Sequence, residues 1–244
     1  MRSVIRIAEL NIAVNHLYDD PLIFSDLFLS DGGETDFEVT VTQEDIEYER
    51  RKTFEEYTLE GFEHIPMFSE VELEYTAILR KIAEKITDFG GIVFHGSAVA
   101  VDGKAYIFTA KSGTGKTTHT RLWLDNIPGA VVVNGDKPII RMIDGKPYVF
   151  GTPWNGKEHL GGKECVPLDS IVVLKRAKEN TITEVPFRDV SARIIQQTYR
   201  SPDREKFLKT LAILNEIGKC IRFFKLGCNM EPDAAIVSYR GLTK

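Results

Sequence analysis

The chain has 244 residues, of which 43% are hydrophobic and 27% charged, a globular composition long enough to form one or two packed domains. Its net charge of −5, with 31 basic against 36 acidic residues, excludes the large positive field that attracts nucleic acid or acidic membranes without sequence preference. The first residues lack the uninterrupted apolar stretch of a signal peptide and no later segment approaches a membrane span, so we expect a cytoplasmic protein with neither nucleic acid nor membrane as a partner.

The first part of the chain combines short apolar patterns with polar segments. Residues 5–14 place apolar side chains at mostly alternating positions with one slip of phase, and residues 36–41 alternate again, so each segment predicts a half-buried strand. Between them lies the turn signal Asp31-Gly32-Gly33. The acidic run at residues 44–56 is typical of a solvated helix or loop rather than of a binding surface.

A longer helix is predicted next. It can begin at Ser69 or Glu70, apolar residues then recur at helical spacing, and the glycine pair at residues 90–91 ends it. We expect this helix to join two parts of the chain. These are a smaller N-terminal α+β lobe at residues 1–90 and a catalytic domain at residues 91–244.

The second part begins with an apolar strand at residues 92–95 and a predicted β-hairpin. The arms of the hairpin are residues 97–101 and 105–109, and the second arm leads directly into a glycine-rich loop. Together the elements predict an α/β fold with a mixed sheet. The remaining predicted elements are strands at residues 130–133, 138–142, 147–150 and 170–175, and helices at residues 117–124, 190–199 and 202–219.

The residues from Ala110 to Thr117 read Ala-Lys-Ser-Gly-Thr-Gly-Lys-Thr, a relaxed form of the phosphate-binding loop in which alanine replaces the first glycine. In such a loop the backbone N–H groups point at the phosphates, and Gly113 and Gly115 allow turns that a side chain would block. Lys116 is placed to meet the β- and γ-phosphates, and Thr117 to bind Mg²⁺. The predicted nucleotide contacts from this loop are Ser112, Gly113, Thr114, Gly115, Lys116, Thr117 and Thr118.

The segment from Phe94 to Thr118 resembles the catalytic domain of HPr kinase/phosphorylase and, more distantly, ATP-dependent PEP carboxykinase. It contains a His-Gly pair at residues 95–96, a short hairpin and the loop, at nearly the spacing found in HPr kinases. The chain resembles most closely the bacterial HPr-kinase-like proteins of peptide-modification cassettes, which share the Gly-Thr-Pro-Trp-x-Gly-Lys segment at residues 151–157. The resemblance implies an HPr kinase/PEP carboxykinase-like P-loop core, and it allows a homo-oligomer because HPr kinases form hexamers.

The resemblance also implies roles for single residues. It gives the lysine and the threonine at the end of the loop the roles stated above and makes His95 the active-site histidine. Residues 134–138 resemble the family's paired-aspartate segment, in which one carboxylate activates the acceptor hydroxyl and helps to order the metal. Asp136 keeps the second position of that pair and Gly135 occupies the first. Because the chain lacks the Glu-x-Arg-Gly segment of HPr kinase, the resemblance does not imply HPr itself as the acceptor.

Each candidate also has a structural interpretation. Asp136 can accept a proton from a hydroxyl and bind Mg²⁺ through water, or it can cap a turn. His95 can hydrogen-bond the γ-phosphate or the aspartate, or it can be a satisfied buried polar group. Lys157 lies in a glycine-flanked loop that suits a phosphate clamp, but exposed lysines are usually solvated. Glu158 is a candidate substitute for the carboxylate missing at 135, and Trp154 packs either a base or the core.

The sequence therefore predicts an ATP- and Mg²⁺-dependent kinase of the HPr-kinase-like serine type. Its acceptor would be a hydroxyl on a peptide, a protein or free serine, and residues 1–90 would help to choose it. The alternative is a nucleotide-binding adaptor or degenerate kinase that recruits a peptide partner without turnover, which the glycine at 135 favours. PEP carboxykinase chemistry is disfavoured by the chain length. In relatives of this kind the phosphate donor is ATP, ADP or pyrophosphate, and all three remain alternatives.

Overall fold

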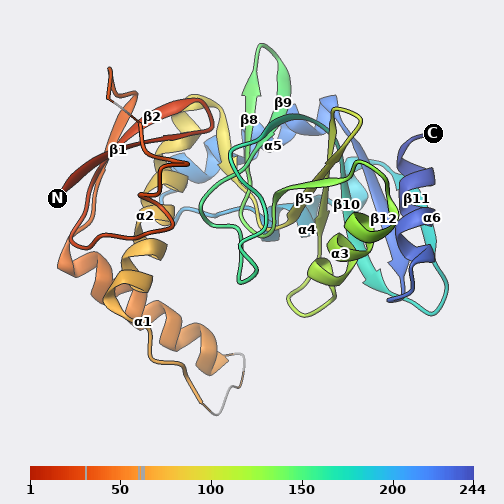
Figure 1. Ribbon diagram of the computed structural model, residues 1–244, viewed down its shortest axis with the longest axis horizontal. Helices are drawn as coiled ribbons and strands as arrows, with labels where there is room; N and C mark the ends of the chain where they lie inside the picture. Colours follow the sequence, from red (N-terminus) through yellow and green to blue (C-terminus); the bar gives the residue numbers. More distant parts are fainter. Residues whose placement is uncertain (31, 60, 62–63) are drawn as a thin grey trace. The chain divides into compact units, whose positions relative to one another are not determined.

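The computed structural model describes residues 1–30, 32–59, 61 and 64–244, and the contacts between them divide the chain into two compact units (Figure 1). The units are Met1–Lys85 and Ile86–Lys244. The contacts therefore assign the short 3₁₀ helix Ile86–Phe89 to the second unit, and the domain boundary expected at residue 90 stays a prediction. Among the described residues, no helix combines the length and the apolar character needed to cross a membrane.

A three-stranded sheet belongs to the first unit. Strands β1 (Arg2–Ile7) and β2 (Leu10–Asn15) are antiparallel, and β3 (Phe37–Thr40) pairs parallel to β2. The single strand expected at residues 5–14 is therefore wrong, because Ala8 and Glu9 form a turn with φ of 51° and 61°. Two positive φ values in succession are typical of a tight hairpin turn, and they explain the slip of phase. In the glycine turn expected at residues 31–33, Asp31 lies outside the described residues.

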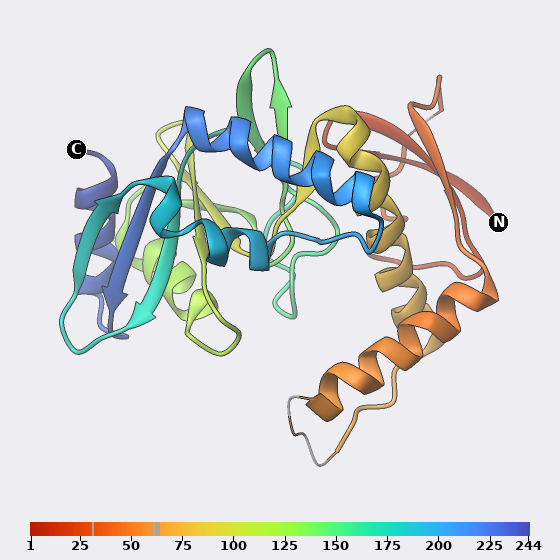
Figure 2. The ribbon, with the colours of Figure 1, turned by 180° about the vertical axis from the view of Figure 1, so that it is seen from behind.

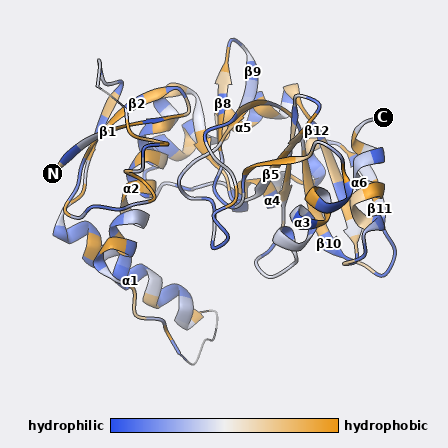
Figure 3. Cartoon of the chain, viewed as in Figure 1, coloured by the Kyte–Doolittle hydropathy of each residue, from blue (hydrophilic) through white to orange (hydrophobic). Residues whose placement is uncertain are grey.

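The two helices of the first unit, α1 (Gln43–Leu59) and α2 (Glu70–Lys85), are joined by partly buried ion pairs. Arg80 of α2 donates from Nη2 to Asp45 at 2.8 Å and from Nε to Glu49. Burial opposes ionisation of Asp45, but hydrogen bonds from the cationic side chains of α2 outweigh it and lower its pKa to about 2. The acidic segment is thus a helix, largely hydrophilic in Figure 3, and its inner face binds α2 rather than solvent alone.

The second unit contains a nine-stranded mixed sheet. Strands β6 (Lys104–Thr109), β10 (Cys165–Arg176) and β12 (Arg222–Cys228) run parallel to one another, so their carboxyl ends lie at the same edge. The predicted hairpin is formed by β6 and β5 (Ser97–Val101). The other strands are β4 (Gly91–Val93), β7 (Val131–Asn134), β8 (Ile139–Ile143), β9 (Lys146–Phe150) and β11 (Thr181–Val185), in the order β4-β8-β9-β10-β6-β5-β7, with β12 between β10 and β11.

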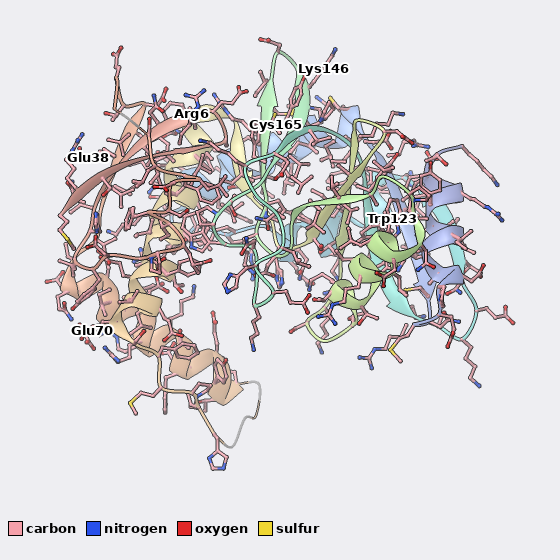
Figure 4. The ribbon with its side chains drawn as sticks, in the orientation of Figure 1. Arg6, Glu38, Glu70, Trp123, Lys146 and Cys165 are labelled. Carbon is pink, nitrogen blue, oxygen red and sulfur yellow. The ribbon has the colours of Figure 1, made fainter. Side chains whose placement is uncertain are left out.

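Helices cover both faces of this sheet, and each face buries its own apolar cluster. Helices α3 (Lys116–Asn126) and α6 (Asp233–Leu242) pack on one face, where Trp123 is fully buried (Figure 4). Helices α4 (Ser191–Gln197) and α5 (Arg204–Cys220) pack on the other face, which is the one seen in Figure 2. The predicted mixed α/β character of the chain is therefore confirmed.

Two strands and one α-helix of the second unit were not predicted, namely β11, β12 and α6. Strand β12 reads Arg-Phe-Phe-Lys-Leu-Gly-Cys, a short run without clear alternation, and short apolar runs do not distinguish a strand from a helix. It is a strand because it pairs with β10 on one side and β11 on the other. These partners are remote in the sequence, so the pairing is a property of the tertiary structure.

Candidate active site

The predicted phosphate loop connects the carboxyl end of β6 to the start of α3, so the expected order of strand, loop and helix is present. Gly113 and Gly115 have φ of 72° and 119°, values that residues with a side chain rarely adopt. Ala110 is buried and its φ is not positive. The alanine that replaces the first glycine of the usual motif therefore fits without backbone strain, and phosphate binding by the loop stays a prediction.

The start of α3 presents free backbone donors. The N–H groups of residues 115–118 have no hydrogen-bond partner within the described chain, whereas the N–H of His119 donates to the carbonyl of Gly115 at 2.9 Å. The loop itself is closed by Thr114, whose N–H donates to the carbonyl of Lys111 at 3.2 Å. Unpaired amides at the positive end of a helix dipole suit an anion.

The carboxylate of Asp136 contacts the side chains of His95 and Lys137. His95 Nε2 is 3.1 Å from its Oδ1, and Lys137 Nζ is 2.7 Å from its Oδ2. Burial opposes ionisation of Asp136, but the hydrogen bond from His95 and the charge of Lys137 hold the pKa of the carboxyl well below its usual range. The same hydrogen bond raises the pKa of His95, but burial and the charges of Lys137 and Lys116 outweigh it and lower that pKa. At neutral pH, Asp136 is therefore ionised and a neutral His95 donates to it.

A fully buried asparagine fixes the turn that carries Asp136. Asn134 Oδ1 accepts hydrogen bonds from the N–H groups of Asp136 and Lys137, at 2.9 and 2.8 Å. Its Nδ2 donates to the backbone oxygen and the hydroxyl of Thr152, at 3.1 and 3.0 Å, which joins the turn to the loop at residues 151–162. In the sequence, Asn134 was noted only as part of the segment at residues 134–138. Its position at the end of an apolar strand could have predicted its role, because a buried polar side chain needs hydrogen-bond partners.

The loop at residues 151–162 lies directly against Gly135. A Cβ at position 135 would come within 2.4 Å of the carbonyl oxygen of Asn155, while the N–H of Gly135 donates to Leu160 at 3.0 Å. A Cβ at Gly156 would likewise lie 3.2 Å from the Cβ of Asp136. The backbone of this loop therefore fills the space that the first aspartate of the family's pair would need.

The same loop carries the other predicted residues. Lys157 and Glu158 line the cavity beside the phosphate loop, but the carboxylate of Glu158 is bound by the guanidinium of Arg121, with Nε 3.1 Å from Oε2. Glu158 as the substitute for a carboxylate at 135 stays a hypothesis. Trp154 is 2% exposed, so it belongs to the core.

One cavity of about 570 Å³ gathers most of the predicted site residues. Its lining includes His95, Ser112, Gly113, Gly115, Lys116, Thr117, Thr118, Asp136 and Lys157. We call it the nucleotide cavity, after the ligand that the sequence predicts for it. Thr114 lies outside it and lines two neighbouring cavities. Burial is the main cause that lowers the pKa of Lys116, an effect that a bound anion would reverse.

The oxygen ligands for Mg²⁺ would be Thr117 and Asp136, which line the nucleotide cavity together. Mg²⁺ is usually bound by one or two protein oxygens together with substrate phosphates and water, and this pair fits that pattern. Within the described ranges, no group of three or more His, Cys, Asp or Glu residues could hold a metal ion.

A further residue that contacts the site was not predicted. Arg176, at the end of β10, donates from Nη2 to the carbonyl of Gly113 at 2.5 Å and from Nε to that of Thr114 at 3.2 Å. These bonds tie two carbonyls of the loop to the end of β10. No motif marks Arg176, because β10 reaches the loop only through its parallel pairing with β6.

We expect Arg176→Ala to weaken ATP binding about two- to tenfold, because two exposed hydrogen bonds to the loop are lost. Calorimetric titration of wild type and variant with ATP measures the effect. Arg193→Ala is the matched control, because Arg193 donates to Gln196 rather than to the loop. Equal ATP affinity in wild type and Arg176→Ala would show that the loop keeps its shape without the arginine.

No family model and no curated protein matches the chain. Among solved structures, the chain is similar to the HPr(Ser) kinase/phosphatase from Coxiella burnetii, with a TM-score of 0.33 and 8% sequence identity over 61% of this chain and 95% of that chain. At this TM-score, the case for a function rests on the geometry of the chain itself.

Proposed function

We propose that this protein is an ATP- and Mg²⁺-dependent kinase that transfers the γ-phosphoryl group to a hydroxyl, the serine of a peptide, a protein or the free amino acid. The observation that carries the proposal is the convergence of a glycine-rich loop with free amides, Lys116, Asp136 and His95 on one cavity. Phosphoryl transfer needs a phosphate cradle, charge neutralisation and a group that orients the nucleophile. Each of these has a candidate in the nucleotide cavity.

The roles follow from the chemistry of each group. The amides at the start of α3 and Lys116 would bind the β- and γ-phosphates, and Thr117 with Asp136 would hold Mg²⁺, which neutralises phosphate charge when bound. Asp136 would take the proton of the acceptor hydroxyl while the hydroxyl oxygen bonds to the γ-phosphorus. The bond between the γ-phosphorus and the β–γ bridging oxygen breaks in the same step, and ADP leaves. His95 would keep Asp136 oriented by donating from Nε2. Residues 1–90 would help to select the acceptor.

Lys116→Ala tests the nucleotide site. We expect this variant to bind MgATP about 10- to 150-fold more weakly than wild type, because a hydrogen bond to a charged group contributes about 1.5–3 kcal/mol. Calorimetric titration with ATP, with and without Mg²⁺, measures it, and ADP and pyrophosphate are titrated in parallel. Lys146→Ala is the control, since Lys146 is exposed at the β8–β9 turn. If Lys116→Ala binds MgATP as wild type does, the loop is not the nucleotide site.

The second candidate function is a nucleotide-binding adaptor that recruits a peptide without turnover. Two observations favour it. The carboxylate of Asp136 already contacts Lys137 and His95. The loop at residues 151–162 also leaves no room for a second carboxylate at position 135. Transfer of phosphate from ATP to serine or to serine peptides, followed by ³¹P NMR, separates the two. Detectable transfer would rule out the adaptor, and formation of phosphoenolpyruvate from oxaloacetate would instead indicate carboxykinase chemistry.

A further inference from the structure

A larger cavity of about 960 Å³ lies on the other side of the phosphate loop and has a basic lining. Five cationic side chains line it, and none of its described lining residues is an aspartate or a glutamate. These five residues, which we call the basic groove, are Lys111, Lys175, Arg176, Arg193 and Lys225.

The sheet places two of these lysines at diagonal positions on one face. In the register of the strands, Lys225 of β12 lies between Val173 of β10 and Thr183 of β11, and Lys175 lies beside Gly227. Directly paired residues project from the same face of a sheet, so both lysines share the face on which α4 and α5 pack further along. Gly227 has no side chain, and the side chains of Ala177 and Thr181 border it, each 3.2 Å from where a Cβ would lie.

The charge of the groove is not neutralised by the protein. Lys111, Lys175 and Lys225 are exposed and form no ion pair with any residue in the described part of the chain. The chain as a whole carries a net charge of −5, so the positive charge of the groove is opposite in sign to the net charge of the protein. Positive side chains in a concave surface focus their field and raise the local concentration of anions.

The position of the groove points to the acceptor rather than to the nucleotide. It shares Ser112 and Gly113 with the nucleotide cavity, whereas Lys116, Thr117 and Asp136 do not line it. A nucleobase is uncharged and would not use the five cations. Free serine carries one carboxylate balanced by its own ammonium group, and its volume is far below that of a cavity at the upper end of the usual ~300–1,000 Å³.

On the basis of the proposed kinase function, we propose that the basic groove binds the acceptor as a peptide segment in which acidic side chains flank the serine. Lys111 belongs to the phosphate loop, while Lys175 and Lys225 lie on neighbouring strands. Acidic side chains bound to these three lysines would leave the serine between them close to Ser112 and Gly113. The groove would thus select the acceptor by charge, and the nucleotide cavity would supply the phosphate.

The test uses two labelled hexapeptides, one with a serine among five glutamates and one with a serine among five glutamines, titrated by fluorescence polarisation. We expect wild type to bind the acidic peptide at least about tenfold more tightly than the glutamine peptide. The double variant Lys175→Ala with Lys225→Ala should lose about tenfold in affinity for the acidic peptide, because two of the cations that face it are removed. Its MgATP affinity should stay within about twofold of wild type.

The control is the double variant Lys146→Ala with Lys244→Ala, which removes the same charge from exposed positions outside the groove; Lys146 is labelled in Figure 4. Equal binding of the two peptides by wild type, or unchanged acidic-peptide binding in the groove variant, would overturn the proposal. A parallel loss of MgATP affinity would make the groove part of the nucleotide site and overturn it as well. A third outcome separates the two proposals: wild type binds the acidic peptide through the lysines but does not bind MgATP. That result would refute the kinase function and leave the groove as a peptide site.

Discussion

Replacing Asp136 with asparagine is expected to slow phosphoryl transfer about 10²- to 10⁴-fold, the usual contribution of a positioned general base. Asp136 and Glu158 are the carboxylates that line the nucleotide cavity, and Glu158 is already bound by Arg121. Asparagine keeps the shape of the side chain and can still accept a hydrogen bond from His95. It cannot take the proton of the acceptor hydroxyl or bind Mg²⁺ with a full charge, so the loss falls on the rate.

Binding measurements separate this role from a structural one. Because Asp136→Asn removes a negative charge near Lys116, we expect ATP without Mg²⁺ to bind as well as or better than to wild type, and the gain in affinity that Mg²⁺ provides to be smaller. The rate is measured with a serine peptide and the binding by calorimetry. Asp144→Asn is the matched control, since Asp144 is exposed at φ 48°, a conformation that asparagine tolerates. A rate within threefold of wild type in Asp136→Asn would leave Asp136 as a turn residue.

The same variant has an expected signature in stability. The pKa of Asp136 in the folded protein lies below its ordinary value, so its ion pair with Lys137 and its hydrogen bond from His95 stabilise the fold above about pH 4, the range in which the unfolded carboxyl titrates. This stabilisation is lost as the pH falls through the lower, folded pKa. The melting temperature of Asp136→Asn should therefore lie below that of wild type at pH 7, and the difference should shrink in acid.

Gly135→Asp is expected to destabilise the protein and not to improve Mg²⁺ binding, although the family resemblance would favour a carboxylate there. The new Cβ would lie 2.4 Å from the carbonyl oxygen of Asn155, so the loop at residues 151–162 must move. That movement would strain the bond from the N–H of Gly135 to Leu160 and the tie from Asn134 to Thr152. Overpacking and lost buried hydrogen bonds together cost on the order of 3 kcal/mol, which lowers the melting temperature by about 6–12 °C.

Gly135→Ala is the matched control for this prediction. Alanine adds the same Cβ without a charge, so the two variants should lose similar stability if the obstacle is the backbone of Asn155. Thermal unfolding measures the loss, and calorimetric titration of MgATP measures binding. A Gly135→Asp protein with an unchanged melting temperature and tighter MgATP binding would show that the loop moves aside readily and that the site can hold two carboxylates.

Local patterns in the sequence predicted the elements around the candidate site. The hairpin of β5 and β6, the loop that follows and the helix α3 were expected from apolar alternation, glycine positions and helix-start signals. The same reasoning took β1 and β2 as one strand, because the turn at Ala8 and Glu9 contains no glycine. It also passed over β12, whose strand character depends on β10 and β11 on either side.

The sequence by itself determined the loop, since the glycines at 113 and 115 are required wherever the chain turns through positive φ. It also named Lys116, His95 and Asp136 as candidates. Only the tertiary structure decided that His95 donates to Asp136, that Arg176 contacts the loop and that the backbone of Asn155 lies against Gly135. It alone also showed that five cations line a groove beside the phosphate loop. The physical reason is distance along the chain: backbone preference is local and can be read from neighbouring residues, whereas these contacts depend on strand pairing and register between remote segments.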